Sequence, residues 1–441
     1  MANQLALNCG LAAAAINYTA PSLGFPQALQ QSWAQYSPYF PAAPYEEPPA
    51  GCDIVQVNLL QRHGARYPTK SAGEAIQKSV KKLQRATTFK DKSLDFVADY
   101  TYTLGTDDLV AFGAAQSFDA GQVHYARYSS LVSDDVLPFV RASGSDRVVD
   151  SATNWTAGFA YASDQEYKPA LSVIFNQASN DTLDDNMCPN VGSSTRETKS
   201  WVDVFAPSIT KRINAAAPGA KLKKHDIPNL MALCPFDTVA HETPSPWCDI
   251  FTTEEWASYE YYGDLNDYYG NGYGQQLGRV QGVGYVNELL ARLTGQPVQD
   301  ATQTNHTLDS SPDTFPLNRT FYADFSHDNE MISIYSAIGL FKQSQPLDPT
   351  NPDEGRSWVV SKMVPFSGRM VTEKLACSAG GGRDGGKNEK DAYIRILVND
   401  ALQPLGFCGD TGNGLCTLDD FVESQAYARN NGEGDWDLCF D

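Results

Sequence analysis

The strongest constraint on the fold is a recurring arrangement in which a short apolar run ends directly in charged or imidazole side chains. The runs Ile54–Leu60, Val136–Val140 and Thr320–Phe325 have the length of buried strands. Further strands are expected at Arg369–Cys377 and Ala392–Val398. Because helical spacing separates several of these runs, the pattern predicts an α/β layer.

A helix is expected directly after the first run. Ser71-Ala72-Gly73-Glu74 has the pattern of a capping box, which predicts a helix beginning there. Ile76, Val80 and Leu83 then recur on one face of that helix. A second helix is predicted after the third run, from the spacing of apolar residues between Met331 and Leu340.

The length of 441 residues exceeds what one compact core normally holds, so more than one domain is expected. Residues 151–314 carry few strand signals and predict a mostly helical domain, inserted into an α/β domain made of residues 46–150 and 315–441. Residues 1–45 predict an N-terminal arm, with a possible leader remnant at 1–16 and an extended, surface-wrapped stretch over 20–50. The Gly-rich segment Ala379–Asn388 predicts a surface loop.

The acidic balance of the chain argues against broad polyanion-binding classes. Thirty-three basic and 53 acidic residues give a formal charge of −20 and a pI near 4.6. Broad binding to nucleic acid or to an anionic membrane needs a basic footprint, so neither partner is expected. No apolar run approaches the length of a membrane span.

Cysteine and glycosylation signals favour a secreted, disulfide-bonded glycoprotein. None of the nine cysteines forms a close C-x-x-C pair, so disulfides in an oxidising compartment are favoured over a zinc site. An odd count leaves one thiol over, and Cys9, in an irregular segment, is the candidate. N-x-S/T sequons, which are candidate glycosylation sites, stand at Asn17, Asn154, Asn180, Asn305 and Asn318.

Three strand ends carry the candidate chemistry. Arg62-His63-Gly64-Ala65-Arg66-Tyr67-Pro68 follows the first run, Arg141 the second and His327-Asp328 the third. Ligands of open α/β sheets bind at the carboxyl ends of strands, so these groups are expected to meet. Guanidinium groups gathered around an imidazole match a phosphoryl group best.

This set of residues suits stepwise phosphomonoester hydrolysis through a phosphohistidine on His63. Arg62, Arg66 and Arg141 would hold the phosphoryl oxygens, and a cationic His327 would donate another hydrogen bond. Asp328, protonated at an acidic working pH, would protonate the leaving oxygen and later accept a proton from water. The guanidinium charge takes the place of a metal, so no metal and no cofactor is expected.

Structural roles are the alternative for each part of this pattern. An arginine–histidine pair at a strand end also occurs in surface ion-pair clusters, and a His-Asp dipeptide more often caps a helix than catalyses. The five fixed positions of Arg-His-Gly-x-Arg-x-Pro, taken together with the downstream pair, favour the catalytic interpretation.

The motifs resemble those of the histidine acid phosphatase family. The segments 139–148, 281–289 and 318–328 are similar to secreted fungal phytases of the basidiomycete branch, and the likeness runs from about residue 30 to the C-terminus. The resemblance implies a phosphoglycerate-mutase-like α/β domain with a smaller, mostly helical domain. It also implies hydrolysis of myo-inositol hexakisphosphate, with an active site between the domains.

The same resemblance implies four disulfides, namely Cys52–Cys377, Cys188–Cys439, Cys234–Cys248 and Cys408–Cys416. The ascomycete members carry lysines at two places where this chain differs. Ala72, Glu74 and Ala75 occupy the first place, and Asn266 and Asp267 the second. Residues 70–92 nevertheless carry seven basic and two acidic side chains, a local +5, and Lys70 is the candidate for a distal phosphate contact.

The expected function is therefore a secreted, monomeric acid phosphatase acting on inositol phosphates. A broad-specificity acid phosphatase without phytate preference is the alternative within enzymes. A phosphoglycerate mutase is disfavoured by the sequons and cysteines. A non-catalytic phosphate-binding protein would need neither His63 nor Asp328.

Overall fold

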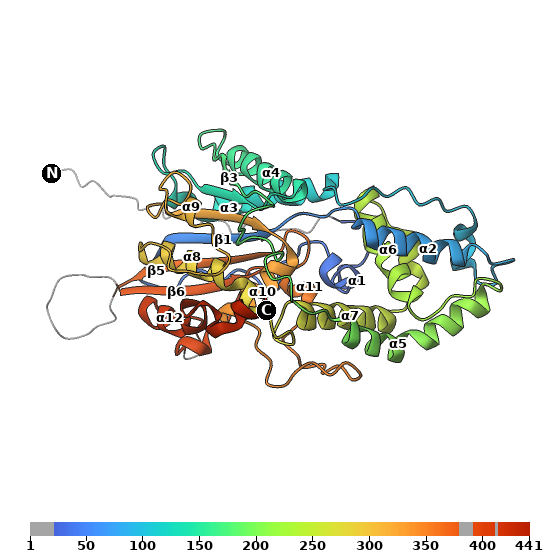
Figure 1. The fold of residues 1–441 in the computed structure, drawn as a ribbon. Coiled ribbons are helices and arrows are strands. Elements are labelled where there is room, and N and C mark those ends of the chain that lie inside the picture. Colours follow the sequence, from blue (N-terminus) through green and yellow to red (C-terminus); the bar gives the residue numbers. More distant parts are fainter. Residues whose placement is uncertain (1–21, 379–390, 411–412) are drawn as a thin grey trace, which may run out of the picture.

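The structure is a computed structural model that describes residues 22–378, 391–410 and 413–441 (Figure 1). Cys9, Asn17, the 1–16 segment and the loop expected at 379–388 lie outside the described residues. The helices are α1 Gln27–Gln30, α2 Lys70–Leu83, α3 Ala111–Tyr128, α4 Asp146–Ala162, α5 Thr195–Ala216, α6 Asp226–His241, α7 Thr253–Gly270, α8 Val283–Thr294, α9 His306–Asp309, α10 Asp328–Ile338, α11 Val360–Met363, α12 Leu418–Ser424, α13 Ala426–Arg429 and α14 Asp435–Leu438.

A single mixed sheet organises the larger part of the molecule. Its strands are β1 Cys52–Arg62, β2 Phe139–Ala142, β3 Leu171–Ile174, β4 Phe321–Ser326, β5 Arg369–Cys377, β6 Asp391–Val398, β7 Ala401–Leu402 and β8 Cys416–Thr417. They lie in the order β3-β2-β4-β1-β5-β6-β7, and β8 pairs with β6. Strands β3, β2, β4 and β1 are parallel, whereas β5 and β6 run antiparallel. The mixed α/β fold expected from the strand–helix pattern is confirmed.

Helices cover both faces of the sheet, so its central strands are buried on both sides. On one face Trp155 and Phe159 of α4 pack on Phe321 and Phe325 of β4. Helices α8 and α10 overlap the strands in the view of Figure 1 and share the main core with the sheet. Residues Phe321–Ser326 of β4 are all buried as a result, which places this strand in the interior and not at a solvated edge.

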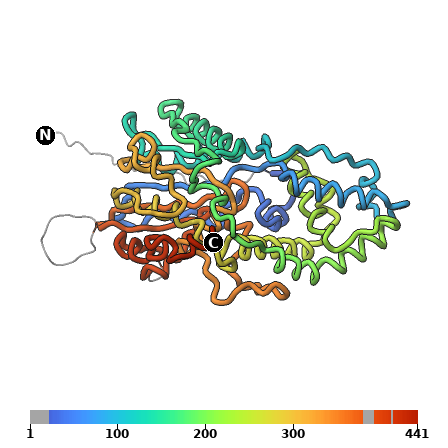
Figure 2. The backbone as a smooth tube through the Cα atoms, viewed as in Figure 1, coloured from blue at the N-terminus to red at the C-terminus, as the bar shows by residue number. Residues whose placement is uncertain are grey.

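A helical lobe extends from one end of the sheet, to the right in Figures 1 and 2, and is built from α2, α5, α6 and α7. Helix α2 packs on α6, and α5 packs on α7. Ile76, Val80 and Leu83 of α2 are buried, as their spacing predicted. Strand β3 falls inside the 151–314 segment yet belongs to the sheet, and the division into domains at the expected boundaries stays a prediction.

Two local expectations are corrected. The cap of α2 is Thr69, whose side chain accepts a hydrogen bond from the Ala72 amide, so the helix begins one residue before Ser71. The stretch expected to lie extended on the surface is in part interior, because Trp33 and Tyr39 are buried and the 3₁₀ helix η1 spans Ala34–Tyr36. Its lack of periodicity reflects packing of an irregular segment, and not exposure.

Four disulfides close the described fold, and they join the pairs that the family resemblance implied. They are Cys52–Cys377, Cys188–Cys439, Cys234–Cys248 and Cys408–Cys416. The first ties paired residues of neighbouring strands β1 and β5. The second joins loop and C-terminus across 251 residues of sequence, a separation for which loop-closure entropy in the unfolded chain is large.

Candidate active site

The carboxyl ends of β1 and β4 meet and bring together five of the residues singled out from the sequence. Arg62 pairs in register with Ser326, so His63 and His327 follow their strands side by side. The two imidazole rings lie 5.7 Å apart, centroid to centroid. Asp328 opens α10, and its carboxylate accepts a hydrogen bond of 2.7 Å from Arg62 Nη2. The sheet therefore assembles this part of the site as expected.

His63 is held in a loop that only glycine at position 64 allows. A Cβ at Gly64 would stand 2.2 Å from the Gly113 carbonyl oxygen, so any side chain there would collide with the start of α3. His63 is 1% exposed, and its Nδ1 lies 2.8 Å from the carbonyl oxygen of the next residue, Gly64. A carbonyl can only accept, so Nδ1 carries the proton and Nε2 keeps its lone pair.

The charge state of His63 suits a nucleophile. Burial, followed by the positive charges of Arg62, Arg66 and Arg147, holds the pKa of His63 well below its ordinary value. The imidazole is therefore neutral in the ligand-free protein at mildly acidic pH, and an attacking nitrogen must be neutral.

The arginines of the site have more donors than protein acceptors. Arg62 Nη1 donates to the backbone carbonyls of Gln35 and Val364, and Arg66 Nη1 donates to that of Tyr67. The Nε atoms of Arg62, Arg66 and Arg147 are buried without a hydrogen-bond partner among the described residues, and so is Nε2 of His327. Buried donors left in this state are costly unless an anion accepts from them.

Arg147 is a site residue that the sequence analysis missed. It lies in the first turn of α4, and its Nη2 is 3.4 Å from His327 Nδ1. Ser151 fixes this turn to the His63 loop, because its hydroxyl donates to the Arg147 carbonyl and accepts from the Gly64 amide. Its placement just after a strand end, at a helix start, is the signal that could have found it.

Arg141 was assigned to phosphate binding, and that assignment is wrong. Strand β2 spans Phe139–Ala142 and ends two residues later than the expected end at Val140, so Arg141 lies inside the strand and opposite Asp324 of β4. Its guanidinium is 1% exposed and donates to Asp324 (2.8 and 3.0 Å) and Glu288 (2.6 Å). Arg292 pairs with the same Asp324 at 2.6 Å, which completes a neutralised network inside the fold.

The charge expected on His327 also needs correction. Burial, then Arg147, lowers the pKa of His327 to about 3, and the nearby Asp328 carboxylate only partly offsets this. His327 Nε2 lies 3.9 Å from an Asp184 carboxylate oxygen. His327 is thus neutral in the ligand-free site at pH 5, and it becomes cationic only when an anion joins the cluster.

Asp328 is ionised in the ligand-free site, contrary to the expected protonated acid. Burial alone would raise its pKa, but the positive charges of Arg62 and Arg66 outweigh that effect and hold the pKa below its ordinary value. Its side chain is 17% exposed and so remains reachable from the cleft. A bound phosphate adds negative charge here and favours the protonated carboxyl.

A neutral pocket of about 180 Å³ adjoins the catalytic residues at the helical lobe. Tyr36 and Phe236 line it, and the Arg66 guanidinium lies 6.0 Å from the Phe236 ring. Its other lining side chains are apolar, aromatic or amide, and none is ionised: Gln35, Ala72, Ile76, Pro228, Asn229, Ala232, Tyr259, Tyr262 and Asn266. Ala72 and Asn266, noted from the sequence, both face this pocket.

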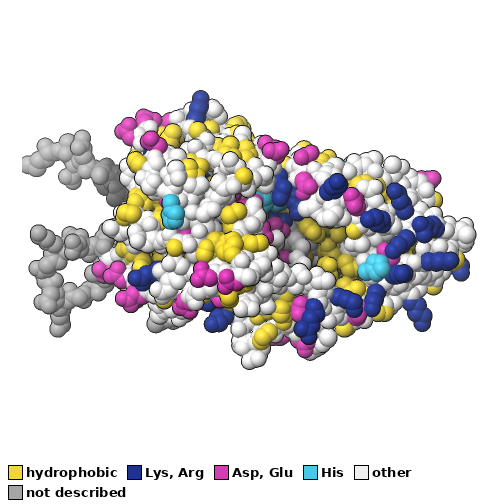
Figure 3. All heavy atoms as spheres, viewed as in Figure 1, with side chains coloured by type: hydrophobic (Ala, Val, Ile, Leu, Met, Phe, Trp, Pro, Cys, Tyr) yellow, Lys and Arg dark blue, Asp and Glu magenta, His cyan; other side chains and the backbone are white. Residues whose placement is uncertain are grey.

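Basic side chains lie further out. Figure 3 shows lysine and arginine gathered over the helical lobe, beyond the hollow that separates it from the sheet. Lys78 and Lys81 of α2 are exposed, as are Arg85, just beyond that helix, and Lys223 and Lys224 before α6. Lys70 is exposed at the first residue of α2, and its contact with a distal phosphate stays a prediction.

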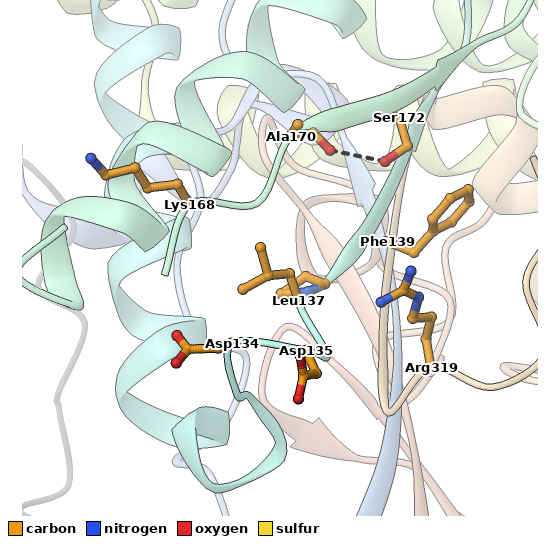
Figure 4. A pocket seen from close by; sticks show the side chains of 9 residues that line it. Asp134, Asp135, Leu137, Phe139, Lys168, Ala170, Ser172 and Arg319 are labelled. Atoms are coloured by element: carbon orange, nitrogen blue, oxygen red, sulfur yellow. Dashed lines mark hydrogen bonds between the residues drawn. The ribbon is translucent and has the colours of Figure 1, made fainter. Parts of the chain in front are cut away.

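A second pocket, of about 250 Å³, lies at the opposite edge of the sheet (Figure 4). Asp134, Asp135 and Arg319 line it beside Phe139, where the parallel strand β2 begins. It shares no residue with the catalytic cluster. Within the described ranges no group of three or more His, Cys, Asp or Glu is placed to hold a metal, and none of the helices is long and apolar enough to cross a bilayer.

The four described sequons differ in exposure. Asn180 and Asn318 are exposed, whereas Asn154 and Asn305 are partly buried. Glycosylation at these asparagines stays a prediction.

Comparison with known proteins agrees with this geometry. The family model described as "Histidine phosphatase superfamily (branch 2)" matches residues 53–399. Phytase A of Emericella nidulans is 42% identical over 429 residues, covering 92% of this chain and 90% of that protein. Phytase A of Aspergillus fumigatus is 41% identical, covering 94% and 91%.

Solved structures show the same fold. The phytase from D. castellii superposes with a TM-score of 0.72 at 23% identity, covering 91% of this chain and 85% of that one. The multiple inositol polyphosphate phosphatase of Bifidobacterium longum, in complex with inositol hexasulfate, gives 0.62 at 14% identity, covering 88% and 96%. With most of its length matched by the family model and by relatives above 40% identity, this chain belongs to branch 2 of the histidine phosphatase superfamily.

Proposed function

We propose that the protein is a phytase, which hydrolyses myo-inositol hexakisphosphate stepwise through a phosphohistidine at His63. The observation that carries the proposal is the neutral His63, with Nε2 free, among three guanidiniums whose buried Nε donors lack acceptors. The names of the relatives support the substrate, since those above 40% identity are called Phytase A.

The first half of the reaction forms the phosphoenzyme. His63 Nε2 attacks phosphorus, and the bond from phosphorus to the leaving oxygen breaks as the new P–N bond forms. Arg62, Arg66 and Arg147 hold the three oxygens that carry the charge of the transferring group. Asp328, protonated once the substrate charge is bound, gives its proton to the leaving oxygen.

The second half of the reaction reverses these roles. A water molecule attacks phosphorus, Asp328 takes its proton, and the P–N bond breaks with its electrons returning to the imidazole. Orthophosphate and the alcohol are the products, and His63 and Asp328 regain their starting states. His327 donates to a phosphate oxygen as the cation that the bound anion stabilises.

A broad-specificity acid phosphatase is the second candidate, and the neutral pocket favours it. A polyanion with several distal phosphates is best held by fixed positive charges, but the lining of this pocket has none. Steering by the exposed basic side chains of α2 and of the segment before α6 supports phytate instead. The ratio of kcat/KM for phytate to that for an aryl phosphate separates the two.

The proposed compartment is extracellular, and the proposed state is a monomer. Four disulfides fit an oxidising environment. Five sequons are consistent with passage through a secretory route.

Trapping of the phosphoenzyme tests the proposal. Acid-labile label from radioactive substrate should appear on the wild-type protein after rapid quenching, and a peptide map should place it on His63. His63→Ala should lose the label and turnover, by about 10⁴-fold or more. Turnover without any trapped label, or label on another residue, would rule the mechanism out.

A further inference from the structure

Asp267 is a buried carboxyl beside the proton donor that the mechanism above does not use. It lies near the C-terminal end of α7 and is 1% exposed. This end of α7 packs on the first turns of α10, where Ser333 donates to the Asn271 carbonyl and Asn329 shares an Asp185 oxygen with Asn271. Asp267 is therefore held rigidly near the start of α10.

Hydrogen bonds fix where a proton on Asp267 must reside. The Ser194 hydroxyl donates to Asn266 Oδ1 at 2.9 Å, so the other end of that amide is a donor. Asn266 Nδ2 donates to Asp267 Oδ1 at 3.0 Å, which makes Oδ1 an acceptor. Asp267 Oδ2 is buried and has no hydrogen-bond partner among the described residues. A proton on this carboxyl therefore belongs on Oδ2.

The charges around Asp267 keep it protonated while Asp328 is ionised. Burial, followed by the Asp328 carboxylate, raises the pKa of Asp267 to about 8; Glu260 of α7 acts in the same direction, while Asn266 and Arg62 act against it. Tyr36 of η1 lies close to the same groups, since both Asp267 and Asp328 raise its pKa. Arg62 pairs with Asp328 and favours ionisation of that carboxyl. Two nearby carboxyls with environments this different carry one proton between them.

We infer that Asp267 is a positioning residue that stores one proton on Oδ2 and passes it, through a bridging water, to Asp328 when substrate binds. The inference rests on the proposed function, in which Asp328 protonates the leaving oxygen.

The proton balance closes over one turnover. Before binding, Asp267 is protonated and Asp328 is not, and the substrate charge moves the proton to Asp328. The leaving oxygen takes it as the P–O bond breaks, which leaves both carboxyls ionised. The attacking water then gives its proton to Asp328, and that proton returns to Asp267 after orthophosphate leaves.

The test compares leaving groups in the full-length protein. Asp267→Asn keeps the size of the side chain but removes the acidic carboxyl proton that could be transferred. We expect kcat for an alkyl phosphate such as glycerol 2-phosphate to fall by about 10- to 100-fold, because general acid catalysis contributes at this scale. We expect kcat for p-nitrophenyl phosphate, whose phenolate leaves without a proton, to change less than about threefold. The alkaline limb of kcat for the alkyl substrate should move to lower pH.

Three comparisons make the outcome decisive. Asp237→Asn changes a buried carboxyl on α6 that bonds the Tyr100 and Ser245 hydroxyls, and it should leave the alkyl-to-aryl ratio unchanged. Asp328→Asn should lower that ratio, and failure to do so would refute the proposed role of Asp328. If Asp328→Asn lowers the ratio and folded Asp267→Asn does not, the inference about Asp267 is wrong.

A measurement on the wild-type protein covers the case in which Asp267→Asn does not fold. Neutron diffraction of deuterated crystals at about pH 6 reads the protonation of both carboxyls directly. Deuterium on Asp267 Oδ2, with Asp328 ionised, is the expected result. An ionised Asp267 would overturn the inference.

Discussion

Two clusters of arginines, one at Asp324 within β4 and one at Asp328 just beyond β4, differ in one property. Arg141 and Arg292 face Asp324 and Glu288, so two positive charges meet two negative ones. The catalytic arginines Arg62, Arg66 and Arg147, in contrast, have one carboxylate in contact, that of Asp328. The positive charges of the first cluster are balanced by carboxylates of the protein, whereas the second cluster has more positive charge and more hydrogen-bond donors than its carboxylate can neutralise and accept from.

This difference teaches how to separate a structural arginine from one that binds substrate. Asp324 shows the complete case: burial would raise its pKa, but Arg141 and Arg292 together lower it to about 2. In the catalytic cluster burial, and then the positive charges of the arginines, instead depress the pKa values of His63 and His327. An excess of positive charge that suppresses protonation of histidine is a site prepared for an anion.

Among the tests of this contrast, Arg147→Ala should have the largest effect, and that effect should be a loss of catalysis. We expect kcat/KM for any phosphomonoester to fall by about 10²- to 10³-fold, as on removal of a transition-state donor. The unfolding midpoint should stay the same or rise, because Arg147 repels Arg66 in the ligand-free protein. Steady-state kinetics and thermal unfolding of the same preparation check both parts; a large loss of stability would contradict the assignment.

Arg141→Met should have the reverse profile. Of the hydrogen bonds that Glu288 accepts from described residues, only the one from the Thr182 hydroxyl would remain. The substitution also removes one of the two guanidinium groups that pair with Asp324. We expect the free energy of unfolding to fall by about 3–5 kcal/mol, the scale for breaking a buried ion pair. Denaturant unfolding measures this. A folded, stable variant with activity reduced as strongly as in Arg147→Ala would restore Arg141 to the phosphate site.

Anion binding should be coupled to proton uptake. In the ligand-free protein His327 is neutral above about pH 3 and Asp328 is ionised. A bound sulfate adds negative charge, which raises both pKa values. Asp328 then receives its proton from Asp267, so the proton taken up from solvent is the one that His327 binds. At pH 5 we expect the protein to take up about one proton or less per sulfate bound. Titration calorimetry in buffers of different ionisation enthalpy measures this uptake. Proton release would show that the site is charged differently.

Lys70→Ala should have the smallest effect. An exposed lysine acts through a screened field, so we expect the KM for phytate to rise by about two- to threefold at low ionic strength and to be unchanged at high salt. Lys78→Ala, which removes another exposed lysine of α2, is the matched control. An unchanged KM for Lys70→Ala in low salt would remove Lys70 from the substrate contacts.

The fold and the centre of the site could be predicted because both depend on local patterns. Apolar runs marked β1, β4, β5 and β6, and the residues just beyond two of them were brought together by parallel pairing of β1 and β4. The burial of Trp33 in the N-terminal arm could not be predicted, since an irregular segment packed on the core has no periodicity.

The error at Arg141 has a specific physical origin. Whether a strand-end arginine is free depends on the residue across from it, and Asp324 lies 183 residues away in sequence. Strand β2 also ends at Ala142, two residues beyond the expected end, which places Arg141 in the strand and not in the loop after it. The pKa values of His327 and Asp328 likewise depend on burial and on nearby arginines, chiefly Arg147 for His327 and Arg62 for Asp328, and one sequence displays neither the burial nor these contacts.

The most direct measurement is a crystal structure with orthovanadate bound. The account predicts vanadium in line with His63 Nε2, and vanadate oxygens within hydrogen-bond distance of Arg62, Arg66 and Arg147, while Arg141 stays paired with Asp324. Vanadate bound to Arg141, or bound away from His63, would contradict the account.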